Sequence, residues 1–235
     1  GDNTSDDKVR RLIGGNIYGG CYNSGHVNGN VVIDINSDVH ERDVLFAKSA
    51  TDENGNTSID IESEDNRRTG VILENQRDDL MAVALSVFGA GKGAGTEIWG
   101  STTVNLIKGY AFQAYGGGEE GVVGKGTIVT DKDDEDKILY DTDGYIQKAY
   151  EAYDAAYSST VNLSGTKVVY TSETAVKDLA ESEYLYGGGN EGNVYGDTYV
   201  NLGNGRIYDV FGGASNADVY GRSQVIIGHN DGFPW

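Results

Sequence analysis

Acidic and amide side chains at regular spacing are the residues of this chain best suited to binding a ligand. Asp141-Thr142-Asp143-Gly144 matches part of an EF-hand loop, in which carboxylate oxygens hold Ca²⁺. With Gly144 at the turn position of such a loop, its first and twelfth positions fall on Leu139 and Tyr150, which carry no carboxylate. The motif therefore predicts a solvated loop, with Asp141 and Asp143 as candidate Ca²⁺ ligands and with no other cofactor.

A second polar set occupies the position between two apolar residues in several alternating runs. Alternation with period two is typical of strands, and it places these polar residues on the outer face. Stacked strands would align them in a column that binds Ca²⁺ or sugar hydroxyls, or whose amides bond to one another on a solvated face. We favour the second interpretation and keep Asn105, Asn162 and Asn201 as candidate ligand-binding residues. The full set is Asp34, Asp60, Asn105, Asn162 and Asn201.

Aromatic residues form a third set. Trp99, Tyr195 and Tyr220 each precede a glycine that opens an alternating run. If these segments stack, the rings form a ladder that stabilises the stack by contact or, where it is exposed, binds sugar rings. These three residues are the aromatic candidates for ligand binding.

Other kinds of chemistry find little support in the residue types. His26, His40 and His229 share no ligand spacing, and no Gly-x-Ser-x-Gly elbow occurs. With 18 Lys and Arg against 37 Asp and Glu, the formal charge of −19 repels nucleic acid and the polyuronate substrates of a lyase. No apolar run approaches the roughly 20 residues of a membrane span. We therefore expect no nucleic-acid partner and no insertion into a membrane.

A repeat positions these residues. Five segments share an aromatic residue, a glycine and two small residues, and each is followed by a short loop, a glycine and an apolar run. The runs contain Ile33, Val104, Ile128, Val200 and Val225. The five segments are Ile17-Tyr18-Gly19-Gly20-Cys21, Val87-Phe88-Gly89-Ala90-Gly91, Ala114-Tyr115-Gly116-Gly117-Gly118, Leu185-Tyr186-Gly187-Gly188-Gly189 and Val210-Phe211-Gly212-Gly213-Ala214.

The spacing of the repeat predicts an all-β, right-handed parallel β-helix, a solenoid with coils of about 25 residues. Positions 87 and 114 are 27 residues apart, and positions 185 and 210 are 25 apart, which suits three short strands joined by glycine-rich corners. The longer spacings, 17 to 87 and 114 to 185, predict insertions at about 36–86 and 130–184. We expect one domain, 1–235, with repeat units 17–113 and 114–209 and a final coil, 210–230.

Both insertions show helical periodicity. Apolar residues spaced by three and four predict short helices at about 75–85 and 172–182. A third helix is predicted at about 145–157 from a stripe of Ile146, Ala149, Tyr150, Tyr153 and Tyr157.

The Tyr/Phe-Gly-Gly-Gly core, the following Gly-x-x-x-Val-Asn-Leu strand and the strand that leads to the next core resemble the repeats of one known group of proteins. These are the secreted adhesin-like, or autotransporter-like, parallel β-helix proteins of gut bacteria. The resemblance covers most of residues 13–230. It implies a secreted or cell-surface binding or structural module. Its partner would be a glycan or a host or cell-surface protein, with neighbouring repeats or domains in a longer chain.

Parallel β-helices also include polysaccharide lyases and glycoside hydrolases, so a polysaccharide-active enzyme is the alternative. Such an enzyme needs two carboxylates about 5 to 9.5 Å apart, or a cation beside a base. Carboxylates of an insertion that converge in a groove and have perturbed pKa values would indicate an enzyme. Acidic side chains that are dispersed in solvent would indicate a binding module. Because no catalytic motif is present, we expect no catalytic residues and a binding role.

Overall fold

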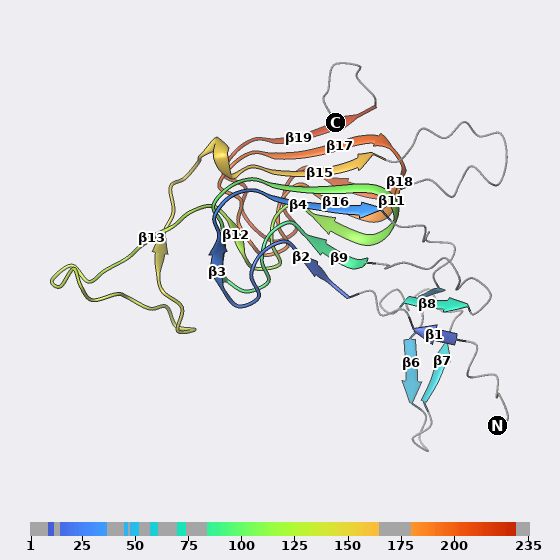
Figure 1. Ribbon diagram of the computed structural model, residues 1–235, viewed down its shortest axis with the longest axis horizontal. Helices are drawn as coiled ribbons and strands as arrows, with labels where there is room; N and C mark the ends of the chain where they lie inside the picture. The colour runs from blue at the N-terminus through green and yellow to red at the C-terminus, as the bar shows by residue number, and fades with distance from the viewer. Residues whose placement is uncertain are drawn as a thin grey trace.

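The computed structural model of the chain is all-β, with one short 3₁₀ helix within the residues it describes (Figure 1). It describes residues 9–11, 15–36, 45–46, 48–51, 57–60, 70–73, 84–164 and 180–228. No helix in these ranges is long and apolar enough to cross a membrane. The elements are β1 (Val9–Arg11), β2 (Ile17–Tyr18), β3 (Ser24–Val27), β4 (Val31–Asn36), β5 (Leu45–Phe46), β6 (Lys48–Thr51), β7 (Thr57–Asp60), β8 (Gly70–Leu73), β9 (Ala84–Phe88), β10 (Gly95–Ile98), β11 (Thr102–Tyr115), β12 (Val122–Val123), β13 (Thr127–Ile128), β14 (Lys148–Ala149), η4 (Ala155–Tyr157), β15 (Ser159–Ser164), β16 (Ala180–Tyr186), β17 (Thr198–Asn204), β18 (Arg206–Phe211) and β19 (Ser223–Ile227).

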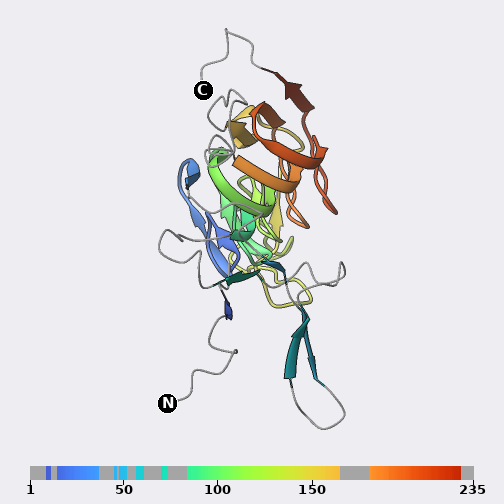
Figure 2. The same cartoon turned by 90° about the vertical axis from the view of Figure 1, so that its right-hand side faces the viewer.

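Most strands belong to three parallel stacks. One runs β4-β11-β15-β17-β19, a second runs β2-β9-β11-β16-β18, and a third runs β3-β10-β12. Strand β11 belongs to the first two stacks because its register shifts before Lys108 and Gly109 follows with a φ of 95°, a conformation that favours glycine. Seen from the side, the strands of each stack succeed one another in chain order (Figure 2). Each stack therefore brings together segments that lie far apart in the sequence.

The five aromatic-glycine segments pair in parallel, in the register that the repeat predicts. Ile17 pairs with Val87, which pairs with Ala114, then Leu185 and finally Val210. The rings that follow these residues stack in one ladder, with centroids 4.6 to 5.1 Å apart. The ladder consists of Tyr18, Phe88, Tyr115, Tyr186 and Phe211.

Glycine is needed where the neighbouring segments approach most closely. A Cβ atom on Gly117 would lie 2.7 Å from the backbone nitrogen of Gly189, closer than real Cβ atoms come to other atoms. Inside the stacks, aliphatic side chains from facing strands bury one another. Val104 and Leu185 are fully buried, and Leu106 is 1% exposed. Burial of such side chains is the main driving force that holds the stacks together.

The helix predicted at about 145–157 is wrong. In its place the chain forms a short antiparallel strand, β14, and the 3₁₀ helix η4. The turn at Asp141–Gly144 reverses the chain, with Gly144 at a φ of 84°, so that Tyr140 bridges Ile146 in antiparallel fashion. The predicted helices at 75–85 and 172–182 lie mostly outside the described residues, and their described ends belong to strands β9 and β16.

Two strands also differ from the repeat as predicted from the sequence. Val161 of β15, and not Ile128, pairs with Val104 and Val200. Ile128 lies in β13, which pairs in antiparallel fashion with β14. Asp60 is outside the polar column, because β7 pairs with β6 in a separate antiparallel pair.

Candidate functional site

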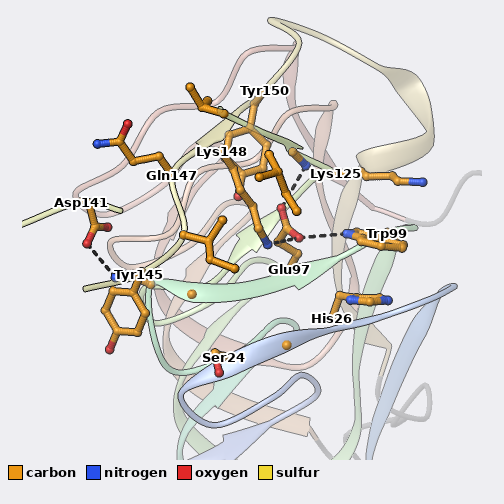
Figure 3. A pocket seen from close by; sticks show the side chains of 17 residues that line it. Ser24, His26, Glu97, Trp99, Lys125, Asp141, Tyr145, Gln147, Lys148 and Tyr150 are labelled. Carbon is orange, nitrogen blue, oxygen red and sulfur yellow. Dashed lines mark hydrogen bonds and ion pairs between the residues drawn. The ribbon is translucent and has the colours of Figure 1, made fainter. Parts of the chain in front are cut away.

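A groove of about 740 Å³ lies between strands β3 and β10 and the segment that connects β12 to β15 (Figure 3). We call this connecting segment, residues 124–158, the arm. The lining includes Ser24, His26 and Trp99 from the strand side and Lys125, Tyr145 and Gln147 from the arm. The volume falls within the range of small-molecule sites, and the lining mixes aromatic with polar groups.

The arm is held in shape by its own turns and antiparallel pairing. The Val129 nitrogen donates to the Gln147 carbonyl at 3.0 Å, and the Leu139 nitrogen donates to the Val129 carbonyl at 3.0 Å. The carboxylate of Asp141 closes the turn that places Tyr145 and Gln147 in the groove, since its Oδ1 accepts from the Tyr145 nitrogen at 2.8 Å. These side chains are therefore positioned by local hydrogen bonds.

Glu97 fixes the arm to the stack. Its side chain is 1% exposed and forms an ion pair with Lys148 of the arm. It also accepts from the Gly126 nitrogen at 2.9 Å, from Trp99 Nε1 at 3.1 Å and from the Tyr150 hydroxyl. Burial alone would raise the pKa of Glu97, but these bonds, led by that of Lys148, outweigh it and lower the pKa below its ordinary value. Glu97 is therefore an ionised structural anchor.

Trp99 lies between a histidine and a lysine. The His26 ring stacks on it with centroids 3.5 Å apart, and the Lys125 ammonium lies 4.4 Å from its centroid (Figure 3). Tyr195 and Tyr220 are the other two aromatic candidates. Their rings stack on each other with centroids 4.6 Å apart, and Trp99 is not part of this stack. The three candidates thus belong to two separate ring clusters.

Gly124 separates these two clusters. Because Ile98 pairs with Val123 and Val123 with Val194, Gly124 occupies the repeat position of Trp99 and Tyr195. It has no ring to contribute, and Tyr150 of the arm supplies one by stacking on Tyr195 at 4.7 Å. Burial, followed by the bond to Glu97, raises the pKa of Tyr150 above its ordinary value, so the hydroxyl stays protonated and donates.

No model of a protein family, no curated protein and no solved structure matches this chain.

The polar column predicted from the sequence is present on the first stack. Asn105 Nδ2 donates to Asp34 Oδ1 at 2.8 Å, Asn162 Nδ2 to Asn105 Oδ1 at 2.7 Å, and Asn201 Nδ2 to Asn162 Oδ1 at 2.8 Å. The next position is Ile226, which ends the column. Because each amide has a neighbour as its partner, the column cross-links adjacent strands. It does not line the groove.

The candidate Ca²⁺ ligands Asp141 and Asp143 lie in the exposed turn of the arm. Asp141 Oδ1 accepts from the Asp143 nitrogen at 3.0 Å as well as from Tyr145, which is the geometry of a turn closed by its own carboxylate. Among the residues that the structure describes, no three His, Cys, Asp or Glu side chains gather as a metal site. The Ca²⁺ assignment stays a prediction.

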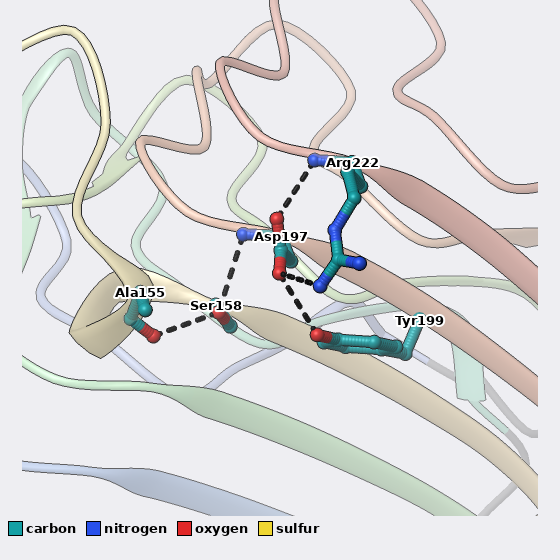
Figure 4. A network of polar contacts seen from close by, with 5 residues as sticks. All are labelled: Ala155, Ser158, Asp197, Tyr199 and Arg222. Carbon is teal, nitrogen blue, oxygen red and sulfur yellow. Dashed lines mark hydrogen bonds and ion pairs between the residues drawn. The ribbon is translucent and has the colours of Figure 1, made fainter.

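A second buried carboxylate, Asp197, has a structural environment (Figure 4). It accepts from the Arg222 nitrogen at 2.7 Å, the Tyr199 hydroxyl at 2.9 Å and Arg222 Nη2 at 3.3 Å. The Arg222 backbone bond is the main cause of the lowered pKa of Asp197, against the opposing effect of burial. This carboxylate therefore joins two successive segments of the repeat, and it does not line the groove.

Among the groove residues that the sequence analysis did not select are Glu97, Lys125, Tyr145 and Lys148. One feature of the sequence could have identified Glu97. It precedes Ile98, and the equivalent position in the paired segment is the apolar Val122, so a charged residue is unexpected there. The partners of Glu97 carry no such signal, because Lys148 is 51 residues away in the arm.

Proposed function

We propose that this chain is a secreted or cell-surface binding module of the adhesin-like type, built as a right-handed parallel β-helix, and that it binds glycan in the groove beneath the arm. The observation that carries the proposal is the groove itself. It combines a ring-lined wall with hydrogen-bonding side chains and is roofed by an insertion into an otherwise regular repeat. Insertions of this kind are where repeat scaffolds commonly carry their specificity.

The solenoid architecture is supported by the pairing of the strands. Three parallel stacks share the same succession of chain segments, and residues 25 and 27 positions apart pair directly, as Leu185 does with Val210 and Val87 with Ala114. Strand β11 passes from one stack into another at Gly109, as a strand at the corner of a coil would. The handedness follows the general preference of parallel crossover connections.

A sugar suits the chemistry of the groove. Tyr145 and Ile146 offer apolar surface, and Ser24 and Gln147 offer hydroxyl and amide groups within the same volume. Sugar rings bind proteins through this combination of ring faces and directed hydrogen bonds. Both faces of Trp99 are already covered, by His26 and Lys125, so Tyr145 is the ring we assign to sugar contact.

The alternative, a polysaccharide-active enzyme, needs a carboxyl group poised to give or take a proton. Two carboxylates line the groove, and both are already engaged: Glu97 by four donors, with a lowered pKa, and Asp141 by its own turn. A general acid in a glycosidase has a raised pKa instead. This favours binding over catalysis in the groove.

A glycan and mucin array, probed with and without Ca²⁺, tests the proposal, and released sugars are assayed in the same wells. We expect selective binding without product, and about a tenfold or greater loss of affinity in Tyr145→Ala. Tyr208→Ala is the matched control, because Tyr208 is 74% exposed and lies outside the groove. Equal losses in both variants, or no binding to any glycan, would refute the assignment, and product release would establish the enzyme.

A further inference from the structure

The geometry points to an acidic sugar as the ligand of the groove, with its carboxylate or sulfate held by Lys125. This inference rests on the proposed glycan-binding function and specifies its ligand class. The relevant end of the groove is the one formed by Lys125, Trp99 and His26 (Figure 3).

Lys125 is a cation held in place without an ion-pair partner among the residues that the structure describes. Its ammonium lies 4.4 Å from the Trp99 ring centroid, and the side chain is exposed at the groove. Lys125 belongs to none of the ion pairs between described residues, which include Lys137–Asp131, Lys148–Glu97 and Arg222–Asp197. A cation held over a ring keeps its hydrogen-bond donors free for an anion.

His26 adds a second donor to the same end. Its ring is stacked on the opposite face of Trp99 from Lys125 and is exposed. A neutral imidazole carries one N–H donor, and the protonated form carries two. His26 lies across the indole from Lys125, so its donors face sugar hydroxyls on that side and Lys125 alone receives the anionic group.

The two carboxylates that line the groove do not oppose an anion at this end. Glu97 is neutralised by Lys148, and Asp141 lies at the far end of the groove from Lys125 (Figure 3). Glu151 and Asp154 line a separate cavity of about 230 Å³ that Lys125 also borders, and Asp154 Oδ1 accepts from the Ala156 nitrogen at 2.8 Å. Among the described residues that line the groove, Lys125 is thus a cation without a carboxylate partner, on a chain whose formal charge is −19.

This contrast gives the groove a means of selection. The overall field repels anions at long range, and salt screens that repulsion over about 10 Å. At contact, the Lys125 ammonium makes a charge-assisted hydrogen bond that a neutral sugar cannot match. A sugar with one localised anionic group is therefore preferred to its neutral parent, whereas a polyanion meets the full repulsion of the chain.

Isothermal titration with lactose, sialyllactose and sulfated lactose tests the inference on the whole chain. We expect the two charged sugars to bind about tenfold more tightly than lactose. Lys125→Gln should abolish this preference, so that the charged sugars bind no more tightly than lactose does. Lys92→Gln is the matched control, since Lys92 is also a lysine near a ring, 5.5 Å from that of Tyr22, but lies outside the groove.

Each outcome separates the inference from the function on which it rests. Equal binding of charged and neutral sugars, tighter binding of lactose, or a preference that survives Lys125→Gln overturns the acidic-sugar inference while glycan binding stands. Failure of all three sugars, and of the wider glycan array, overturns both. A preference for only one of the two anions identifies the acidic group.

Discussion

Replacing Lys148 by methionine isolates the ion pair that fixes the arm to the stack. The substitution keeps most of the length of the side chain and leaves the 1% exposed carboxylate of Glu97 without its cation. Breaking a buried pair in this way costs about 3 to 5 kcal/mol. Glu97 keeps three other donors, and the Lys148 side chain is 21% exposed. We therefore expect a smaller loss of unfolding free energy, about 2 to 3 kcal/mol at neutral pH.

Urea denaturation measures this loss without adding salt that would screen the pair, and a loss of that size lowers the melting temperature by roughly 4 to 12 °C. Hydrogen exchange should show that the amides of Val129 and Leu139, in the arm, lose protection before the amides of β11 do.

The pH dependence of the Lys148→Met effect distinguishes charge from packing. The folded-state pKa of Glu97 lies below its ordinary value of 4.5, so the pair stabilises the fold above about pH 4.5, and this stabilisation is lost as the pH falls through the folded pKa. The deficit of the variant should therefore shrink on acidification. Lys137→Met is the control, because Lys137 pairs with Asp131 on the exposed part of the same arm and should show no measurable change. A stable Lys148→Met protein at neutral pH, or a deficit that persists in acid, refutes the anchoring role.

Three further predictions concern the stacks. Gly117→Ala should lower the free energy of unfolding by more than about 3 kcal/mol in thermal unfolding, because the new Cβ would lie 2.7 Å from the Gly189 nitrogen. The control is Gly213→Ala, whose Cβ has its nearest atom at 3.8 Å, and it should change the free energy of unfolding by less than about 0.5 kcal/mol. Asn162→Ala removes two column bonds and should cost about 1 to 2 kcal/mol in urea, roughly twice the cost of Asn201→Ala, which removes one; equal costs would argue against the column. Burial raises the pKa of Tyr115 from 10.0 to about 12, so the free energy of unfolding should fall as the pH rises between these values. The fall should be less steep in Tyr115→Phe, and an equal dependence on pH in both proteins would exclude this contribution.

The parallel pairing was predictable from sequence because its determinants are local and repeated. Val104, Asn105 and Leu106 alternate in the same way as Val200, Asn201 and Leu202, and a period-two register leaves only one alignment that buries the apolar residues of both strands. The column of amides followed from that register. The amides bond to each other, in agreement with the favoured interpretation. Their other candidate role, in ligand binding, has no such local determinant and stays a prediction.

The arm was not predictable in the same way. The spacing of Ile146, Tyr150, Tyr153 and Tyr157 satisfies a helical stripe, but Tyr153 is 47% exposed while Tyr150 packs on Tyr195. What decides the conformation is tertiary: Tyr150 and Lys148 both reach Glu97, which belongs to another segment of the repeat. Sequence periodicity reports which residues share a face, and it does not report which distant carboxylate that face meets.

The glycine at position 124 connects the repeat to the groove. A Cβ on Gly124 would lie 2.7 Å from Cδ2 of Tyr195, so an aromatic residue like those at the equivalent positions does not fit here with Tyr195 where it stands. The missing ring leaves room for Tyr150, and a Cβ on Gly126 would likewise lie 2.9 Å from the Tyr150 ring. The arm thus docks where the aromatic series is interrupted, and Lys125, between these two glycines, is carried over Trp99 by the same arrangement. An interruption of the aromatic position, followed by an insertion that carries its own tyrosine, is therefore the sequence feature by which a groove of this kind could be recognised in other repeats.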